Sequence, residues 1–390
     1  DPWRDEQPGK IMHEIRYGEL ANTNQIPFTP YYGTIDATPL FLVLLSEYVK
    51  WTGDLKIVEK LSTNIEAALI WIDEYGDRDG DGFVEYNQES SKGIANQGWK
   101  DSADSIVHRN GDYAKAPIAL SEVQGYVYQA KMGIAGIYDV IGKETEARKL
   151  RNQAMKLKVN FDKQFWMEDK SFYAIALDGE KQQVGTITSN PGHVLFSGIL
   201  DEEKIDHLTR HFTSEKLFSG YGIRTMAEGE AGYNPMSYHD GSVWPHDNSM
   251  ILLGMGKSKR QTQANTVIQG LIDASAYFEY ERLPELFCGY SSESNAVKYP
   301  VACSPQAWAA GTPLVFVQTM LGLYPDCIAK KVEISPNLLD EMNELHVRDI
   351  TIGEGKLSLA IYRSNGGYEV KVTKNTSGFE VQFPIGVTQK

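Results

Sequence analysis

Apolar residues recur every three or four positions over residues 54–75, the spacing that lines one face of a helix. This pattern predicts an amphipathic helix there. The preceding run, 37–50, is almost continuously apolar and opens with a threonine–proline pair typical of a helix N-terminus, so we expect a helix buried on most sides. A glycine and an aspartate in the linking residues 51–54 suit the end of one helix and the cap of the next.

Residues 140–144 and 254–258 also contain glycine and also predict a turn that joins two helices. The first of these turns joins a helix from about residue 116 to one that runs to about residue 165, and another apolar run covers 305–323. Long loops in a compact domain are usually functional, and the connections between these helix pairs are long and rich in Gly, Trp, Tyr, His and Asp. They are residues 76–115, 167–190, 213–246 and 277–304.

Helical hairpins with short turns at one end and long loops at the other would, in a ring, gather all the long loops at one mouth. The pattern therefore favours an all-α fold, an α/α toroid, over residues 1–328, with a linear α-solenoid as the alternative. From residue 329 to 390 the pattern changes to strand-like alternation, with a turn at 365–367, which predicts a small antiparallel β appendage. The expected strands are 331–334, 356–361, 368–372 and 379–381.

The net charge limits the kinds of binding partner, and the cysteine content indicates the cellular compartment. The 390 residues carry 52 acidic and 38 basic side chains, a net charge of −14, which repels phosphate backbones and anionic lipid. No segment approaches the roughly 20 apolar residues of a spanning helix. We therefore expect neither a nucleic-acid nor a membrane partner. Cys288, Cys303 and Cys327 cannot all pair, which indicates reduced thiols and a cytoplasmic location.

Carboxylates stand out in two of the long loops. Asp101 and Asp104 follow Trp99 directly, while Glu285 lies between a proline and apolar residues. Each segment alone also fits a helix start or a short turn. Two carboxylates at one mouth, among aromatic rings, meet the requirement of glycoside hydrolysis, in which one acid protonates the leaving oxygen and the other acts as nucleophile or activates water.

Two further segments bear on metals. His239 and His246 are seven residues apart in a loop, which matches no standard zinc-ligand spacing and favours binding of sugar hydroxyls. Residues 77–82 match the start of a calcium loop, but the twelfth position is Gln88 instead of glutamate. We interpret this segment as a tight acidic turn, with calcium at Asp77, Asp79 and Asp81 as the alternative. No metal and no cofactor is predicted.

Five motifs in order resemble the bacterial amylo-α-1,6-glucosidase, or glycogen-debranching-like, family of glycoside hydrolases. They are residues 8–14, 30–41, 98–102, 122–126 and 244–247, and the resemblance spans about residues 8–325. It implies an (α/α)6 barrel related to that of glucoamylases, and inversion of the anomeric centre. Members of the family also carry an N-terminal β-rich domain. Because this sequence opens on Asp1 without an initiator methionine, we expect a fragment whose partner is that missing domain.

The resemblance also implies roles for individual residues. Asp101, in a Trp-x-Asp segment, is the implied general acid, and Glu285, in a Leu-Pro-Glu segment, the implied general base. Aligned instead to the Ser-Gly-x-Asp pattern of trehalases and processing glucosidases, Asp104 would be the acid; otherwise it binds substrate. The implied substrate-binding residues are Tyr32, Asp36, Trp99, Lys100, Asp104, Glu122, Gln124, His239, Trp244, His246 and Trp308.

The sequence thus predicts an inverting, exo-acting glycoside hydrolase that releases a terminal sugar from a neutral oligosaccharide or glucan. The resemblance alone implies glucose and α-1,6 branch points, because the residue types do not separate glucose from mannose. One alternative is a carbohydrate-binding module without catalysis. Another is a different α/α-barrel enzyme, such as an epimerase, a glycoside phosphorylase or a mannosylglycerate-type hydrolase.

Overall fold

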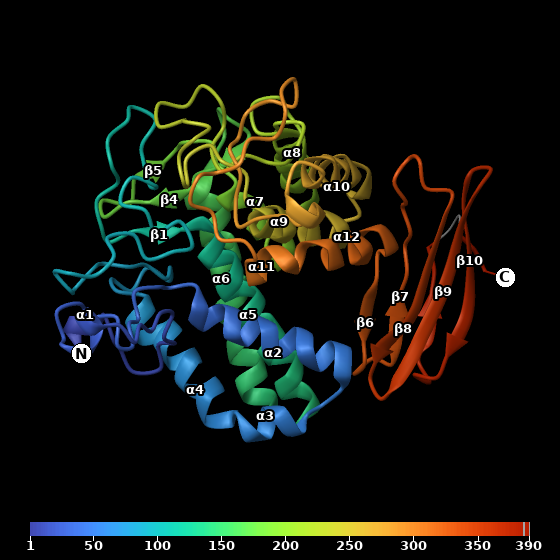
Figure 1. The fold of residues 1–390 in the computed structure, drawn as a ribbon. Coiled ribbons are helices and arrows are strands. Elements are labelled where there is room, and N and C mark those ends of the chain that lie inside the picture. Colours follow the sequence, from blue (N-terminus) through green and yellow to red (C-terminus); the bar gives the residue numbers. More distant parts are fainter. Residues whose placement is uncertain (385–386, 390) are drawn as a thin grey trace.

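The computed structural model describes residues 1–384 and 387–389, as a helical body followed by a C-terminal β region (Figure 1). Short 3-10 turns cover Pro2–Arg4 and Glu279–Glu281, and a π-helical turn covers Trp71–Gly76. The helices are α1 (Glu19–Asn22), α2 (Ala37–Thr52), α3 (Lys56–Lys60), α4 (Ser62–Ile70), α5 (Ser121–Val140), α6 (Glu144–Phe165), α7 (Asn190–Ser197), α8 (Glu202–Phe212), α9 (Pro245–Lys257), α10 (Gln261–Ser275), α11 (Ala307–Ala310) and α12 (Thr312–Leu321).

The longer helices form two layers. In the inner layer α2 packs on α5, α5 on α7, α7 on α9 and α9 on α12 (Figure 1). Helices α4, α6, α8 and α10 each pack against the inner helix that precedes them in their hairpin. The predicted helical hairpins are thus confirmed, and the main body is helical. Closure of these hairpins into a toroid stays a prediction.

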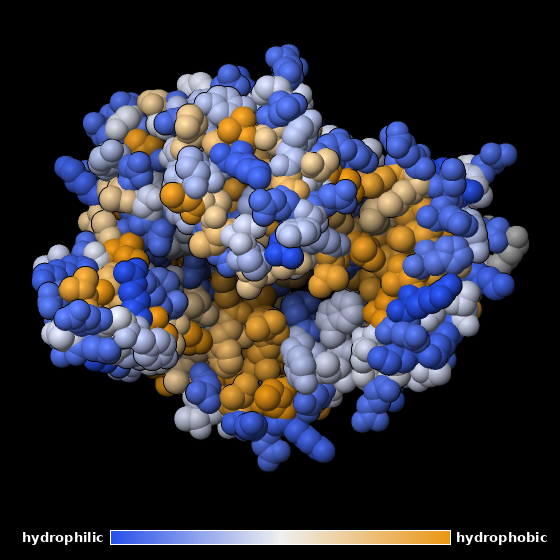
Figure 2. Space-filling model, viewed as in Figure 1, coloured by the Kyte–Doolittle hydropathy of each residue, from blue (hydrophilic) through white to orange (hydrophobic). Residues whose placement is uncertain are grey.

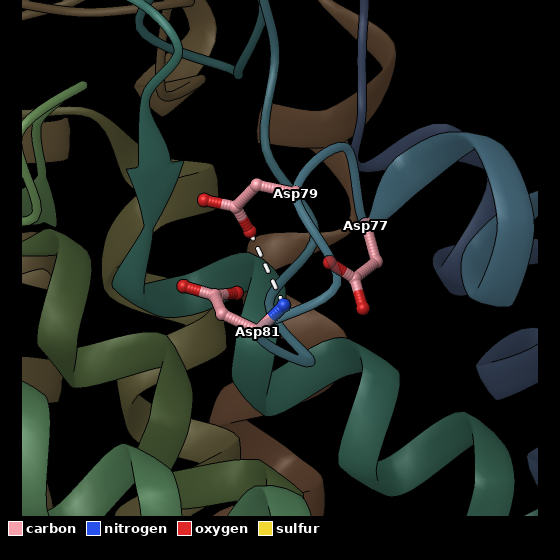
Figure 3. A group of neighbouring side chains, drawn as sticks. All are labelled: Asp77, Asp79 and Asp81. Carbon is pink, nitrogen blue, oxygen red and sulfur yellow. Dashed lines mark hydrogen bonds between the residues drawn. The ribbon is translucent and has the colours of Figure 1, made fainter.

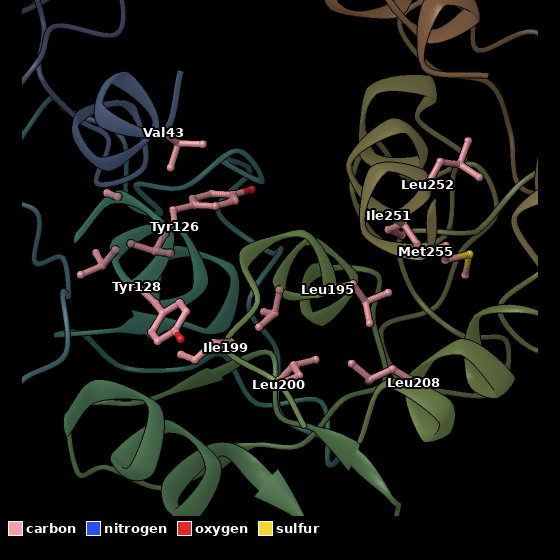
Figure 4. Packing of buried hydrophobic residues seen from close by; sticks show 14 of the residues in the cluster. Val43, Tyr126, Tyr128, Leu195, Ile199, Leu200, Leu208, Ile251, Leu252 and Met255 are labelled. Atoms are coloured by element: carbon pink, nitrogen blue, oxygen red, sulfur yellow. The ribbon is translucent and has the colours of Figure 1, made fainter. Parts of the chain in front are cut away.

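Apolar side chains from successive inner helices interlock to form the core. Figure 4 shows Val43 of α2, Tyr126 of α5, Leu195 of α7 and Ile251 of α9 in one buried cluster. Burying side chains of this size contributes about 1.5 to 3 kcal/mol each relative to leaving them exposed. Because this cluster joins one helix to the next, it fixes the inner layer and with it the loops that the helices carry.

The prediction of a turn at 254–258 was wrong, because Gly254 and Gly256 lie inside α9. A Cβ atom built at Gly254 would stand 2.4 Å from the Cβ atom of Leu195, so the glycine lets α9 approach α7 closely. The turn between α9 and α10 comes later, at residues 258–260. Here glycine serves helix packing instead of ending the helix.

The predicted helix over 54–75 is broken into α3, α4 and the π-helical turn. Leu61 separates the first two pieces with φ −99° and ψ 12°. The apolar stripe continues across this break, so its spacing did not reveal it. Similarly, Gly311 divides the predicted helix over 305–323 into α11 and α12, and the helix expected from about 116 begins at Ser121.

The β region contains two small sheets. One has the strand order β12–β10–β9–β8 and the other β11–β7–β6. The expected turn lies between β9 and β10, with Gly366 at φ 93°. The bounds are β6 (Tyr324–Asp326), β7 (Lys331–Glu333), β8 (Glu344–Ile352), β9 (Gly355–Ser364), β10 (Gly367–Asn375), β11 (Glu380–Gln382) and β12 (Val387–Gln389).

This region differs from the prediction in its strand pairing and in three strands, β6, β8 and β12, that were not predicted. The pairs β7–β11 and β10–β12 are parallel, so the appendage is not wholly antiparallel. Strand β8 was missed because a register shift between Val347 and Ile350, with Asp349 at φ 56°, interrupts its alternation. Short strands also occur in the long loops: β1 (Ala119–Leu120), β2 (Trp166–Met167), β3 (Phe172–Tyr173), β4 (Ala176–Leu177) and β5 (Gln183–Val184).

No described helix combines the length and the apolar character that crossing a membrane requires. The three cysteines are free thiols; Cys288 and Cys327 are buried, whereas Cys303 is exposed.

Candidate active site

A cavity of about 540 Å³ lies at the end of the inner layer where the helices begin. Asp36 is the residue before α2, and Tyr126, His193 and His246 lie in the first two turns of α5, α7 and α9. The long loops supply the rest of the wall. The cavity therefore brings together residues that are distant in sequence. The predicted site residues that line it are Asp36, Trp99, Asp101, His246 and Trp308.

Asp101 projects from the first long loop into this cavity and is accessible to solvent there. Desolvation by the surrounding cavity wall raises the pKa of its carboxyl group to about 6, and the negative charges of Glu14, Asp36 and Glu285 also raise it. A carboxyl group with a pKa near 6 retains a substantial protonated fraction close to neutral pH. This is the state that a general acid requires.

The loop that carries Asp101 is pinned by its neighbours. The Ser102 hydroxyl lies 2.7 Å from Nδ1 of His239, and Asn96 donates from Nδ2 to the Ser102 carbonyl at 2.7 Å. Burial, followed by the charge of Lys100, lowers the pKa of His239 to about 3. His239 is therefore neutral, and its Nδ1 can accept the hydrogen bond from Ser102. His239 thus helps to position the loop that carries Asp101, and it is not a lining residue of the cavity.

Lys100 is also directed away from the cavity. Its Nζ donates to the backbone carbonyl of Thr225 at 2.7 Å, and its side chain is fully buried. Burial lowers the pKa of Lys100, although the charges of Asp247, Asp240 and Glu122 oppose the shift. Lys100 thus links the loop that carries Asp101 to the loop before α9.

Glu285 is buried and is held at both carboxylate oxygens. The Tyr238 hydroxyl donates to Oε1 at 2.8 Å, and the backbone N–H of Cys303 donates to Oε2 at 2.9 Å. The backbone N–H of Glu285 in turn donates to the Cys303 carbonyl at 3.0 Å. Such a clamp orients a carboxylate as a hydrogen-bond acceptor. Because the charge of Glu285 raises the pKa of Asp101, the two groups also interact electrostatically.

Aromatic rings wall the cavity. His246 lies flat on Trp308, with 3.7 Å between ring centroids and 3° between planes, and Trp308 remains 41% exposed. Trp99 stands edge-on to His246 at 4.8 Å and stacks on His193 at 5.8 Å. Trp244 is buried behind them and donates from Nε1 to the Tyr238 carbonyl at 2.8 Å. The exposed aromatic face gives the apolar side of a sugar ring a surface to stack on.

The remaining predicted residues occupy varied positions. Asp36 accepts a hydrogen bond from the Thr34 hydroxyl, and burial raises its pKa. Glu122 is buried; it accepts a hydrogen bond from Asn190 at 2.8 Å through Oε1, and burial raises its pKa. Gln124 binds the backbone N–H and carbonyl of Val84 at 2.9 and 2.7 Å, so its amide is used within the fold.

Tyr32 and Asp104 are not lining residues of the cavity. Tyr32 lies on the segment just before Asp36, where its backbone N–H donates to the Arg4 carbonyl at 2.9 Å. Asp104 is exposed, and its charge contributes to a raised pKa of about 7 at Asp240, for which burial is the main cause. Of Asp101 and Asp104, Asp101 is the one that lines the cavity.

Sequence reasoning missed a hydrogen-bonded row of three buried side chains, two of which, Tyr126 and His193, line the cavity. The Tyr126 hydroxyl lies 2.5 Å from Nδ1 of His193, and Nε2 of His193 lies 2.7 Å from Oδ1 of Asp247. Tyr126 and Asp247 fell within recognised motifs, but His193 stands alone in an apolar helix and gave no signal. His13, which lies within the recognised segment 8–14, and Ser249, which lies outside the recognised motifs, also line the cavity and were not predicted as site residues.

The acidic segment 77–82 lies apart from this site and forms a tight turn. Asp77, Asp79 and Asp81 cluster there, and Oδ1 of Asp79 accepts from the backbone N–H of Asp81 at 3.2 Å (Figure 3). The Nζ atom of Lys181 lies 2.9 Å from Asp79, 2.8 Å from Asp81 and 2.7 Å from Glu85. The ammonium group of Lys181 therefore offsets part of the negative charge of these carboxylates.

The aromatic cavity of this helical body holds two carboxyl groups of raised pKa, Asp36 and Asp101, and Glu285 is clamped as an acceptor outside the lining residues. Carboxyl groups in different environments beside aromatic rings fit a glycoside hydrolase. The sequence profile of the mannosylglycerate hydrolase MGH1-like glycoside hydrolase domain matches residues 22–295, so the chain belongs to this family. The match supports a glycosidase and does not single out the amylo-α-1,6-glucosidases. No curated protein matches the chain significantly.

Solved structures share the fold at low sequence identity. A sialidase and the GH78 rhamnosidase of Bacillus sp. GL1 each give a TM-score of 0.64 at 13% identity, over 85% and 93% of this chain. The chain spans only 30% and 35% of their lengths. The GH63 mannosylglycerate hydrolase from Thermus thermophilus, in complex with Tris and D-glycerate, gives a TM-score of 0.58 at 13% identity, over 81% of this chain and 86% of that one.

Proposed function

We propose that the protein is an inverting, exo-acting glycoside hydrolase in which Asp101 is the general acid and Glu285 the general base. The observation that carries the proposal is the contrast between the two carboxyl groups. Asp101 lies in the cavity with a pKa raised to about 6, whereas Glu285 accepts hydrogen bonds at both oxygens from Tyr238 and Cys303. Carboxyl groups in opposed environments are the usual basis of separate acid and base roles.

In the proposed reaction Asp101 gives its proton to the glycosidic oxygen as the bond to the anomeric carbon breaks. Glu285 takes a proton from a water molecule, whose oxygen attacks the anomeric carbon from the opposite face. The product sugar therefore has the inverted configuration. This mechanism requires the two carboxyl groups to be about 6.5 to 9.5 Å apart, which leaves room for the water.

The substrate we propose is a neutral α-glucoside whose terminal sugar stacks on Trp308. Among the described residues that line the cavity there is no lysine and no arginine. Burial also lowers the pKa of His13 and of His246, which favours their neutral forms. The lining therefore offers little to an anionic substrate. The family resemblance adds four further parts to this proposal. They are release of glucose at α-1,6 branch points, a closed (α/α)6 barrel, a cytoplasmic location and a β-rich partner domain on the same polypeptide.

A mannosylglycerate-type substrate is the second candidate. The family profile carries that name, and the mannosylglycerate hydrolase from Thermus thermophilus shares the fold. Glycerate bears a carboxylate, which would need a cationic partner beyond the residues that line the cavity. The two candidate substrates therefore differ in their leaving group, which is neutral in the α-glucoside and carries a negative charge in mannosylglycerate.

Proton NMR on a panel of isomaltose, maltotriose, limit dextrin and mannosylglycerate tests this proposal. We expect β-glucose to appear first from an α-glucoside, and Asp101→Asn and Glu285→Gln to abolish its release, while Asp104→Asn serves as the matched control. Initial α-glucose would instead indicate retention. Release of mannose from mannosylglycerate alone would establish the second candidate. Binding without any product, unchanged in both variants, would indicate a carbohydrate-binding module.

A further inference from the structure

One row of polar side chains reaches the cavity and takes no part in the proposed acid–base chemistry. Tyr126 of α5, His193 of α7 and Asp247 of α9 are joined by the two short hydrogen bonds through the His193 ring nitrogens. All three residues are buried, and Tyr126 is only 4% exposed. Tyr126 and His193 line the cavity, whereas Asp247 does not. Because the row is shielded from water, the hydrogen-bonding role of each member is set by its neighbour in the row.

The direction of these hydrogen bonds follows from Asp247. An ionised carboxylate only accepts hydrogen bonds, so Nε2 of His193 carries a hydrogen and donates it to Oδ1 of Asp247 at 2.7 Å. In a neutral imidazole the other ring nitrogen, Nδ1, then has only a lone pair. The Tyr126 hydroxyl therefore donates its hydrogen to Nδ1 at 2.5 Å. No hydrogen is left on that oxygen for the cavity, where it can only accept.

The charges around the row favour a neutral imidazole at His193. Burial lowers the pKa of Lys100, and the charge of Asp247 is the largest of those that oppose this shift, so Asp247 already faces a cationic partner. Burial raises the pKa of Glu122, the other carboxyl group that faces His193, which favours its uncharged form. An imidazolium would be a second buried positive charge that shares one carboxylate with Lys100, and buried charges without full compensation are costly.

The Tyr126 hydroxyl reaches the cavity beside apolar surface. Figure 4 shows the ring of Tyr126 projecting from α5 toward α9. Figure 2 shows a hollow between α2 and α12 with apolar residues around it, and Leu40 and Val315 of these two helices line the cavity. In a pocket with apolar walls, a small number of placed polar groups fixes the orientation of a ligand and provides specificity. An oxygen that can only accept selects for a ligand group that can donate.

We propose that Tyr126 is a specificity-determining residue that accepts a hydrogen bond from one hydroxyl group of the terminal sugar, and that His193 and Asp247 are positioning residues that keep it an acceptor. The inference deepens the proposed function and rests on it, because it takes the cavity to be the sugar site. What Tyr126 selects is a hydrogen-bond donor at one position of the sugar ring. A sugar with hydrogen or fluorine at that position lacks the donor and is bound less well.

A double-mutant cycle between the protein and the sugar tests the inference. The probes are p-nitrophenyl α-glucoside and the analogues that each lack one ring hydroxyl, or the matching mannosides where the NMR experiment has shown release of mannose. We expect loss of one particular hydroxyl to lower kcat/KM of the parent about tenfold more than that of Tyr126→Phe. Tyr128→Phe is the matched control and should keep the pattern of the parent, because Tyr128 is a buried tyrosine of the same helix that does not line the cavity.

A fluorinated analogue separates an acceptor from a donor. Fluorine at the position identified by the cycle cannot donate, so the parent should handle this analogue as poorly as the deoxy analogue. In Asp247→Asn the amide donates to Nε2, which moves the imidazole hydrogen to Nδ1 and frees the Tyr126 hydroxyl to donate toward the sugar. We therefore expect the fluorinated analogue to gain about threefold in kcat/KM over the deoxy analogue in Asp247→Asn. A merely structural role of Asp247 would lower both values alike.

Binding separates failure of this inference from failure of the proposed function. It is followed by tryptophan fluorescence, since Trp99 and Trp308 line the cavity. If the parent binds the probes without hydrolysing them, the hydrolase proposal is wrong, and the same differences measured in Kd support the inference. Hydrolysis with equal effects of every deoxygenation in the parent and in Tyr126→Phe would overturn the inference alone. A parent that favours the fluorinated over the deoxy analogue would also overturn it, because Tyr126 would then donate. Absence of any binding would overturn both.

Discussion

The hydroxyl of Tyr238 donates a hydrogen bond of 2.8 Å to Oε1 of Glu285, and the backbone N–H of Cys303 holds the other carboxylate oxygen. Tyr238 precedes α9 in the loop between α8 and α9, while Cys303 lies in the loop before α11. The proposed base is thus fixed between two long loops that are far apart in sequence. Its orientation depends on contacts that no single segment of the sequence contains.

Tyr238→Phe is therefore expected to lower kcat by about tenfold with little change in KM, because a hydrogen bond to a charged group is worth about 1.5 to 3 kcal/mol and its loss leaves the base free to turn. Steady-state kinetics on the substrate found by NMR measures this. Tyr299→Phe is the matched control, since Tyr299 packs against the ring of Tyr238. An unchanged kcat in Tyr238→Phe would show that this clamp does not position the base.

In the proposed mechanism, the pKa of Asp101 sets the alkaline limit of the pH–activity profile. Burial raises this pKa to about 6, and a general acid acts in its protonated form. We expect kcat/KM to fall above about pH 6, by about tenfold for each further pH unit, because this parameter reports ionisation in the free enzyme. A profile that stays level to pH 8 would argue against Asp101 as the acid.

Asp101→Asn is expected to stabilise the fold while reducing kcat by a factor of about 10² to 10⁴. The folded-state pKa of about 6 lies above the unfolded value of 3.8, so the unfolded chain releases this proton first as the pH rises. Stability is thus lost between about pH 3.8 and 6, and the loss persists at neutral pH. Asparagine cannot ionise, so the variant should melt at a higher temperature at pH 7 and at the same temperature as the parent near pH 3.

Asp104→Asn provides the control for that experiment. Asp104 is exposed and is not among the residues that line the cavity. Its replacement should leave both the melting temperature and kcat close to those of the parent protein. A large loss of kcat in this variant would instead assign the acid role to Asp104.

The helical pairing was predictable because apolar spacing reports which face of a helix is buried. The same spacing could not reveal the break at Leu61, since apolar residues continue on both sides of it. It also could not show that Gly254 sits inside a helix, because only the close approach to Leu195 explains a glycine there. Tertiary packing decided both cases.

The sequence predicted those site residues that lie in motifs recognisable within one short segment of the chain. Asp101 and Trp99 stand close together in a polar loop, and both line the cavity. Tyr126, His193 and Asp247 come from three different helices, so their contacts arise only when those helices pack. Lys100 and Gln124 look like substrate ligands in sequence, but both bind backbone groups of the fold.

Trp308→Ala is expected to raise KM by about tenfold with a smaller effect on kcat. The indole forms the exposed face of the stack with His246, and an aromatic pair contributes about 0.5 to 1.5 kcal/mol beyond area burial. Trp308→Phe should retain most of the affinity. Tyr280→Ala, at an exposed aromatic residue that does not line the cavity, is the control. Equal KM values in Trp308→Ala and the parent would remove this residue from the proposed sugar subsite.

Lys181→Met is expected to lower the free energy of unfolding by about 2 kcal/mol, because removing one partner leaves the buried carboxylate of Glu85 without its cation. Burial lowers the pKa of Lys181, but hydrogen bonds with Asp81, Glu85 and Asp79 outweigh this and raise it overall, so the ammonium group is charged throughout the working pH range.

Adding Glu85→Gln to Lys181→Met should restore part of the lost free energy of unfolding, since the amide carries no charge to leave unpaired. Urea unfolding of the single and double variants measures both effects. Lys331→Met removes the partner of an exposed ion pair with Glu333 and should leave the free energy of unfolding almost unchanged. Equal losses in Lys181→Met and Lys331→Met would show that the acidic turn does not depend on its internal cation.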